Sequence, residues 1–194
     1  GLTVGSHTVV ELQNDGYDVV VIDNLNNSSE QVKARIESIT GKPFELLVGD
    51  VNDTVALQGL FKKHSFDGVI HFAAYKAVGE SVENPIMYYQ NNVSGLISVL
   101  EAMNTFEVSN LIFSSSCTVY GAATDLPVTE DTLIQKAESP YGTTKILGED
   151  IIQDFVSIIT SFRPDSPKIT FDIPKCPLLF RELYLNIFPF LVVE

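Results

Sequence analysis

Short runs rich in Val, Ile and Phe alternate along this chain with longer segments whose apolar residues recur at a helical period. Strands are predicted at Asp18–Asp23, Phe44–Val48, Gly68–Phe72 and Asn110–Ser114, and helices at Ser6–Asn14, Ser29–Ile39, Thr54–Lys63, Pro85–Asn104 and Tyr141–Phe155. Each predicted strand is almost continuously apolar, as expected where helices cover both faces of a sheet. The alternation therefore predicts an α/β fold with a Rossmann-like doubly wound parallel sheet.

The two ends of the sequence depart from this pattern. A doubly wound sheet normally begins with its central strand, whereas this sequence starts at Gly1, in the turn that should follow that strand. Residues 156–194 contain five prolines, no glycine and no regular alternation. We therefore expect an incomplete Rossmann-type domain in residues 1–155, lacking its first strand, and a divergent tail in residues 156–194 with no recognisable domain.

Composition and charge exclude several classes of partner. The formal net charge of −13 opposes nucleic-acid binding, which depends on Lys and Arg contacts to phosphates. The longest apolar stretch, Leu178–Val193, contains charged residues and is shorter than the roughly 20 residues of a membrane span, so we expect no membrane insertion. The two cysteines form no disulfide framework, which favours a cytoplasmic location. His7 and His71 have no partners at metal-ligand spacing, and no metal site is expected.

A glycine and an acid frame the first predicted helix and the strand that follows it. Gly5 stands at the head of the helix, and Asp23 ends the strand. In dinucleotide sites the helix N-terminus receives the pyrophosphate, and an acid about 20 residues further on binds a ribose. The full fingerprint has three glycines and only the last is placed here, so Gly5 alone is also consistent with tight helix packing.

A tyrosine and a lysine lie one helical turn apart near the end of the predicted domain. Tyr141 and Lys145 share one face of their helix because residues four apart are neighbours there. A tyrosine with the usual pKa near 10 becomes a base at neutral pH only if the phenolate is stabilised by roughly 4 kcal/mol, and a nearby ammonium has the right sign for this. The same spacing also occurs on the exposed faces of ordinary helices.

Polar residues follow two of the predicted strands, at the edge where ligands bind in open α/β sheets. The run Ser114–Ser116 follows one strand, and Lys76 follows another. A serine at this edge could bond a substrate hydroxyl whose proton Tyr141 removes. Alternatively, these serines satisfy backbone groups in the turn. Asn91 is a further candidate to face the same edge.

Taken together, these motifs are very similar to those of UDP-glucose 4-epimerases of the extended short-chain dehydrogenase/reductase superfamily. The matching segments include GSHTVVEL at Gly5, VIDNLNNS at Val21, HFAAYKAVGES at His71, YYQNNVSG at Tyr88, FSSSCTVYG at Phe113 and SPYGTTK at Ser139. They occur in the family's order and spacing, and the resemblance covers about residues 5–155. It identifies residues 1–155 as an NAD-binding domain.

The resemblance implies a cofactor, a reaction and a role for each motif. NAD would accept hydride from C4 of UDP-glucose or UDP-galactose and return it to the other face of the sugar. Tyr141 would be the base at the 4-hydroxyl, with Lys145 lowering its pKa and Ser116 assisting. The implied cofactor contacts are Gly5, Asp23, Asn24, Asp50, Val51, Phe72, Ala73, Lys76, Asn91, Tyr141 and Lys145. The resemblance also implies a homodimer.

The resemblance stops near Phe155, and the C-terminal substrate domain of the family is absent from the remaining sequence. Two alternatives to an active epimerase therefore stay open. One is a non-catalytic NAD-binding fragment, and the other is a related nucleotide-sugar dehydratase or decarboxylase. Dehydratases usually place acidic residues directly after the serine at the strand end, whereas here Cys117 and Thr118 follow Ser116.

Overall fold

The computed structural model describes residues 3–124, 126–129, 132–162 and 190–193. The elements in chain order are α1 (Thr3–Asn14), β1 (Val19–Asp23), α2 (Gln31–Thr40), β2 (Glu45–Val48), α3 (Thr54–Lys63), β3 (Gly68–His71), α4 (Val78–Glu83), α5 (Pro85–Tyr89), the π-helical turn η1 (Gln90–Ser94), α6 (Gly95–Thr105), β4 (Asn110–Phe113), the 3₁₀ turn η2 (Cys117–Tyr120), α7 (Pro140–Phe162) and β5 (Phe190–Val193). Across the described residues, no helix combines the length and apolar character that a membrane span requires.

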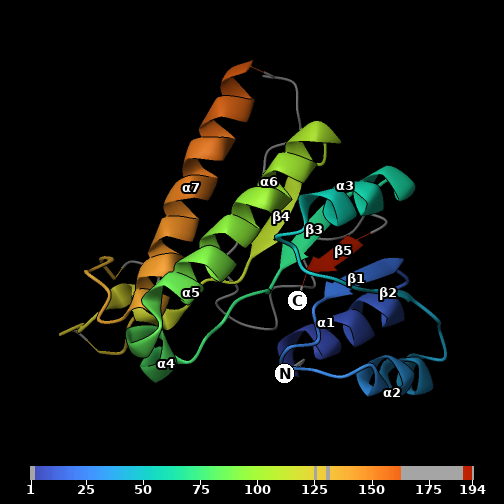
Figure 1. Cartoon of the computed structure of the whole chain (residues 1–194), viewed down its shortest axis with the longest axis horizontal. Helices are drawn as coiled ribbons and strands as arrows, with labels where there is room; N and C mark the ends of the chain where they lie inside the picture. The colour runs from blue at the N-terminus through green and yellow to red at the C-terminus, as the bar shows by residue number, and fades with distance from the viewer. Residues whose placement is uncertain (1–2, 125, 130–131, 163–189, 194) are drawn as a thin grey trace.

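The strands form one parallel sheet in the order β2-β1-β5-β3-β4. This arrangement confirms the predicted α/β class with a doubly wound sheet. In the usual doubly wound order, the strand at the position of β5 is the one that precedes the first helix. Here that central position is filled from the predicted tail, by Phe190–Val193 (Figure 1). The remainder of the predicted tail beyond α7 lies outside the described residues.

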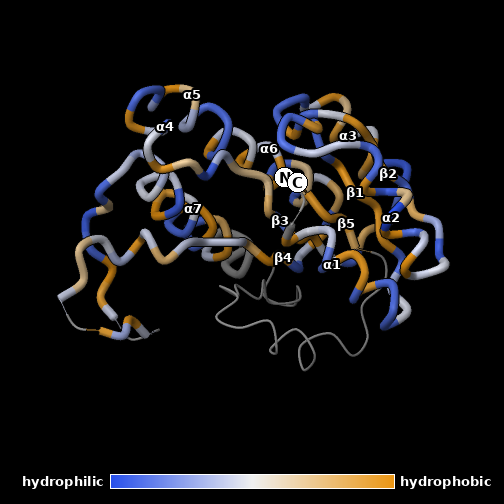
Figure 2. Tube along the Cα trace, turned by 90° about the horizontal axis from the view of Figure 1, so that it is seen from below, coloured by the Kyte–Doolittle hydropathy of each residue, from blue (hydrophilic) through white to orange (hydrophobic). Residues whose placement is uncertain are grey.

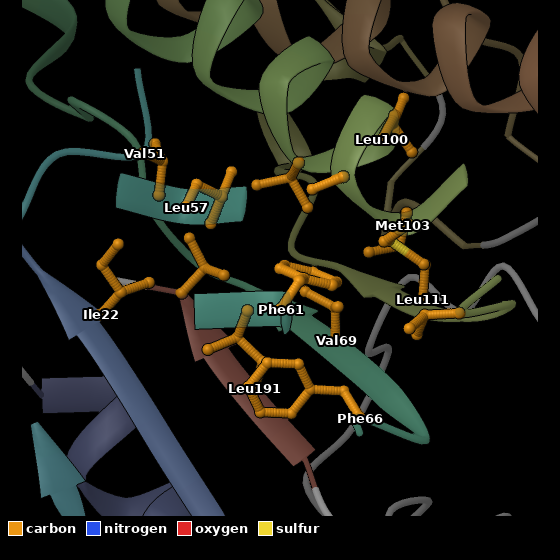
Figure 3. Packing of buried hydrophobic residues seen from close by; sticks show 14 of the residues in the cluster. Ile22, Val51, Leu57, Phe61, Phe66, Val69, Leu100, Met103, Leu111 and Leu191 are labelled. Carbon is orange, nitrogen blue, oxygen red and sulfur yellow. The ribbon is translucent and has the colours of Figure 1, made fainter. Parts of the chain in front are cut away.

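Helices cover both faces of the sheet, and a hydrophobic cluster lies under each layer (Figure 1). On one face, side chains of α3, α6 and α7 pack against the strands, with Leu57, Val99 and Ile152 among the buried residues. Figure 3 shows part of this cluster, in which Leu191 of β5 lies among side chains of the neighbouring elements. On the other face, α1 and α2 contribute Val9 and Ile36. Both faces of the strands are therefore buried, which explains their continuous apolar sequences.

Local sequence explains several helix ends. Asp53 caps α3, and its Oδ1 accepts hydrogen bonds from the amides of Val55 and Ala56. Gly41 ends α2 in the left-handed conformation, with φ of 69°. Asn84 stands before α5, but its side chain makes no capping bond.

The predicted helix Pro85–Asn104 is a continuous run of α5, η1 and α6, with a π-helical turn in its middle. Together with α4 and the start of α7, α5 lies at one end of the molecule, and α2 lies at the other end (Figures 1 and 2). The α6 part of the run crosses the middle of the sheet beside α3. Close contact between α7 and the sheet depends on Gly148, where an added Cβ would lie 2.6 Å from the Phe113 ring. The N-terminal turns of α7 are thereby held against the carboxyl end of β4.

Candidate active site

A pocket opens at the edge of the sheet where the parallel strands end. Residues that follow β1, β2, β3 and β4 contribute to it, together with η1 and the first turns of α7. Its lining consists of Val4, Asp23, Asn24, Asn27, Ser28, Gly49, Asp50, Val51, Phe72, Ala73, Ala74, Tyr75, Lys76, Asn91, Ser114, Tyr141 and Lys145. The topology thus brings together ten of the residues predicted from the sequence, although they come from segments more than 100 positions apart.

Asp23 shapes the loop that forms one side of the pocket. Its Oδ1 accepts a hydrogen bond of 2.7 Å from the amide of Leu25, and its Oδ2 accepts one of 2.8 Å from Ser28 Oγ. Leu25 has a positive φ of 58°, a conformation that the short bond to Asp23 helps to hold. Two carboxylate oxygens offer about four acceptor positions, so Asp23 retains capacity for hydroxyl donors of a ligand.

Lys145 places a buried positive charge at the other side of the pocket. Its side chain is only 4% exposed, and Nζ donates a 2.8 Å hydrogen bond to the carbonyl oxygen of Ser114. Nζ also lies 4.8 Å from the centroid of the Phe113 ring, within the range of a cation–π interaction. Burial lowers the pKa of Lys145 to about 8, against the opposing attraction of Glu149. The ammonium therefore remains largely protonated at neutral pH.

Glu149 lies one turn further along α7 and is 2% exposed. Ser115 Oγ donates a hydrogen bond to its Oε1. Burial raises the pKa of Glu149, while the bond from Ser115 and the charge of Lys145 act in the opposite direction. Its spacing of four from Lys145 is the sequence signal that indicates this residue.

Tyr141 lines the pocket from the first turn of α7, and Asn92 holds that turn in place. Asn92 Nδ2 donates 3.0 Å bonds to the Tyr75 carbonyl oxygen and to Thr144 Oγ1, and its Oδ1 accepts a 2.8 Å bond from the amide of Tyr75. Thr144 Oγ1 in turn donates to the carbonyl oxygen of Tyr141. Asn92 thus connects η1, the loop after β3 and the start of α7, a role that no local sequence pattern indicates.

Two of the predicted residues lie outside the pocket lining. Ser116 Oγ accepts bonds from the amide and the hydroxyl of Thr118, at 3.3 and 3.0 Å, and so caps η2. Both bonds use Ser116 as an acceptor, which leaves its own proton to donate. Gly5 is buried in the first turn of α1, next to Val4 of the lining. The serine of this run that lines the pocket is Ser114.

His71 ends β3 beneath the site and is fully enclosed. Its ring stacks on Phe113, with 5.9 Å between centroids, and its Nδ1 has no hydrogen-bond partner among the described residues. Burial, together with the charge of Lys145, lowers the pKa of His71 to about 3. The imidazole is therefore neutral at physiological pH, and it supports the ring over which Lys145 lies.

Comparison with known proteins assigns this architecture to a family. The family model described as GDP-mannose 4,6 dehydratase matches residues 3–162. Because the match extends over most of the chain, the chain belongs to this family.

Within the family, the similarity is to proteins named UDP-glucose 4-epimerase. The protein from Yersinia pestis is 50% identical over 151 residues, which make up 78% of this chain and 45% of the relative. The protein from Bacillus subtilis is 46% identical over 151 residues, with 78% and 44% covered. The resemblance predicted from the motifs is confirmed.

Solved structures agree with the sequence comparison. The UDP-glucose 4-epimerase of Bifidobacterium longum, in complex with NAD+ and UDP, has a TM-score of 0.80 and 43% identity, covering 87% of this chain and 48% of that one. The enzyme from Stenotrophomonas maltophila, with bound NAD and formylated UDP-arabinopyranose, has a TM-score of 0.79 and 39% identity, with the same coverage of 87% and 48%. The chain spans about half the length of the relatives it matches.

Proposed function

We propose that the pocket binds NAD and a UDP-hexose, and that it serves the interconversion of UDP-glucose and UDP-galactose by transient oxidation at C4. The observation that carries the proposal is the placement of Tyr141 and Lys145 in one pocket with Asp23. A phenol that can take a proton, a buried ammonium and a ribose-binding carboxylate are thereby combined at the ligand-binding edge of a doubly wound sheet. The relatives that carry the same fold include structures with NAD and UDP.

The lining residues have the chemistry that NAD requires. Asp23 and Asn24 would offer acceptors to the adenosine ribose, Asp50 and Val51 would border the adenine, and Lys145 would offer a donor to the nicotinamide ribose. The rest of the proposed cofactor contacts are Gly5, Phe72, Ala73, Lys76 and Asn91. An apolar wall next to a buried carboxylate matches a ligand with a flat base and a diol. When bound, NAD supplies a hydride acceptor and donor for C4 of the sugar.

The chain's own residues supply the proton chemistry. Tyr141 takes the proton from the 4-hydroxyl, and the buried charge of Lys145 lies one turn further along the same helix, in the same pocket. Ser116 donates a hydrogen bond to the same substrate oxygen. Asn92 and Thr144 keep the turn that carries Tyr141 in a fixed orientation. This arrangement limits the reorganisation that the proton transfer requires.

The proposal is tested by supplying the chain with NAD and UDP-galactose and following the formation of UDP-glucose. The variant Tyr141→Phe should lose at least about a hundredfold in conversion, the typical contribution of a general base, and it should still retain NAD. Tyr89→Phe, a tyrosine outside the pocket lining, is the matched control and should retain activity. Undiminished conversion by Tyr141→Phe would refute the assignment.

A second candidate function is NAD binding without turnover. It is favoured by the coverage of the relatives, because the match includes only about half of their length. Bound NAD in the absence of any UDP-glucose would identify this case. A dehydratase reaction, the activity for which the family model is described, would instead yield a dehydrated keto sugar, which mass spectrometry distinguishes from an epimer by the loss of water.

The cellular setting follows from the same proposal. We propose a cytoplasmic location, where NAD and nucleotide sugars are both available. A homodimer through α5 and α6 is also proposed, because Ile86 and Ile97 expose apolar side chains on this run of helices.

A further inference from the structure

The position of β5 at the centre of the sheet is defined by hydrogen bonds on both sides. β5 pairs in parallel with β1, where Val21 lies opposite Val192, and with β3, where Val69 lies opposite Leu191. Further bonds hold both ends of the strand. The amide of Phe190 donates to the Asp18 carbonyl oxygen at 2.8 Å, and the Val193 carbonyl oxygen accepts from two amides after β3. The segment is therefore paired along its whole length.

The groove that receives β5 has a shape matched to its side chains. Phe190 lies against Gly68, where an added Cβ would come within 2.7 Å of the ring, and its ring meets Tyr17 edge to face at 5.4 Å. Phe190 and Val192 enter the cluster under α1 and α2, whereas Leu191 and Val193 enter the cluster on the opposite face. All four side chains are at most 1% exposed. Because Gly68 has no side chain, there is room for an aromatic ring opposite it, and an aromatic residue therefore fits at this position of the strand.

The carboxyl end of β5 also supports the candidate site. The carbonyl oxygen of Val193 accepts hydrogen bonds of 2.8 and 3.0 Å from the amides of Phe72 and Ala73. Both of these residues line the pocket. The backbone that forms this wall of the pocket is therefore held in position by the last residue of β5.

We propose that the groove between β1 and β3 is a binding site for an extended apolar strand, that its occupant is the chain's own segment 190–193, and that seating this strand positions the pocket wall. The groove accepts a parallel strand with an aromatic residue at Gly68 and alternating aliphatic residues toward both layers. Recognition would resemble the addition of a peptide to a sheet, with the difference that both neighbouring strands contribute hydrogen bonds.

The test uses the full chain with Cys117 and Cys176 replaced by serine. Paired cysteines are introduced as Val21→Cys with Val192→Cys, because these residues are opposite one another and face the same layer. Neighbouring strands lie about 4.8 Å apart, within the range that a disulfide spans. The control pair is Val20→Cys with Val192→Cys, whose side chains face opposite layers. Mild oxidation should join the first pair within one chain and leave the control pair unjoined.

Amide hydrogen exchange on the same protein tests the effect on the pocket. The intact disulfide should slow exchange at the amides of Phe72 and Ala73 by about tenfold or more relative to the reduced form, because opening of β5 then becomes more costly. Absence of the cross-link, equal cross-linking of the control pair, or a cross-link only between two chains would overturn the assignment of the groove to segment 190–193. Unchanged exchange at both amides would overturn the positioning of the pocket wall.

Discussion

Replacement of Lys145 by methionine tests the buried ammonium directly. Methionine keeps an unbranched side chain of similar size and removes the charge. Burial lowers the pKa of Lys145 from 10.5 to about 8, which at about 1.4 kcal/mol for each tenfold change in proton affinity corresponds to about 3 kcal/mol. Below pH 8 both the folded and the unfolded chain hold this proton, and the cost of burying the charge is constant.

The dependence on pH follows from the difference between the two states. Between pH 8 and 10.5 the unfolded chain still holds the proton that the folded chain has lost, so the free energy of unfolding rises with pH. The stability of the wild type relative to Lys145→Met should therefore increase by about 2.5 kcal/mol between pH 7 and pH 10. Titrations that both proteins share cancel in the difference.

Urea unfolding followed by circular dichroism at intervals between pH 7 and pH 10 measures this difference. The substitution Lys62→Met, on an exposed position of α3, controls for the loss of one positive charge. A constant stability difference between the wild type and Lys145→Met over the whole range would refute the reasoning, because the lysine would then hold its proton equally in both states.

Three further substitutions test other parts of the structure. Asn92→Leu should lower the free energy of unfolding by about 2 kcal/mol or more in urea titrations, because it removes the hydrogen bonds to Tyr75 in the loop after β3 and to Thr144 in α7. Gly68→Ala should lower the free energy of unfolding by about 1–3 kcal/mol, because the new methyl group meets the Phe190 ring. The control Gly59→Ala has open space around it in α3, so it should leave the free energy of unfolding unchanged or raise it by up to about 1 kcal/mol in the same titrations. Equal effects of the two substitutions would contradict the packing at Gly68. Burial lowers the pKa of His71 to about 3, so between pH 6.5 and 3 the unfolded chain binds a proton that the folded chain does not. The free energy of unfolding should therefore fall as the pH falls through this window. In acid titrations, His71→Gln should lack the share of this decrease that comes from the histidine.

The local parts of the fold could be predicted from the sequence. β1 to β4 lie within one residue of the predicted strands, since a continuous apolar run is a local signal. The position of Phe190–Val193 could not be predicted, because strand pairing joins segments far apart in sequence and its hydrophobic run resembles the residues around it. From sequence alone, this segment therefore belongs to a divergent tail.

In the candidate site, too, residues that belong to a local pattern could be predicted, whereas residues that depend on long-range contacts could not. Tyr141 and Lys145 were found because their spacing is a property of one helix. Asn92 was missed, since its importance comes from contacts with the loop after β3 and with α7. The sequence indicates Ser114 only as part of a run of serines, and only the turn geometry after β4 distinguishes it from Ser116, which caps η2.

The π-helical turn η1 reconciles two packing requirements that a regular helix would place out of phase. Before it, α5 buries Tyr88, whose hydroxyl bonds with the backbone of Ala77; after it, α6 directs Leu96 and Met103 into the sheet-facing cluster. The wider turn changes the angular offset between these two sets and presents Asn91 and Asn92 toward different neighbours. Because it holds one residue more than a regular turn, η1 absorbs that residue without rotating α5 against α6. The same number of residues wound as a regular α-helix would rotate one helix against the other by about a quarter turn, so that either the aromatic anchor or the aliphatic stripe would have to turn toward water.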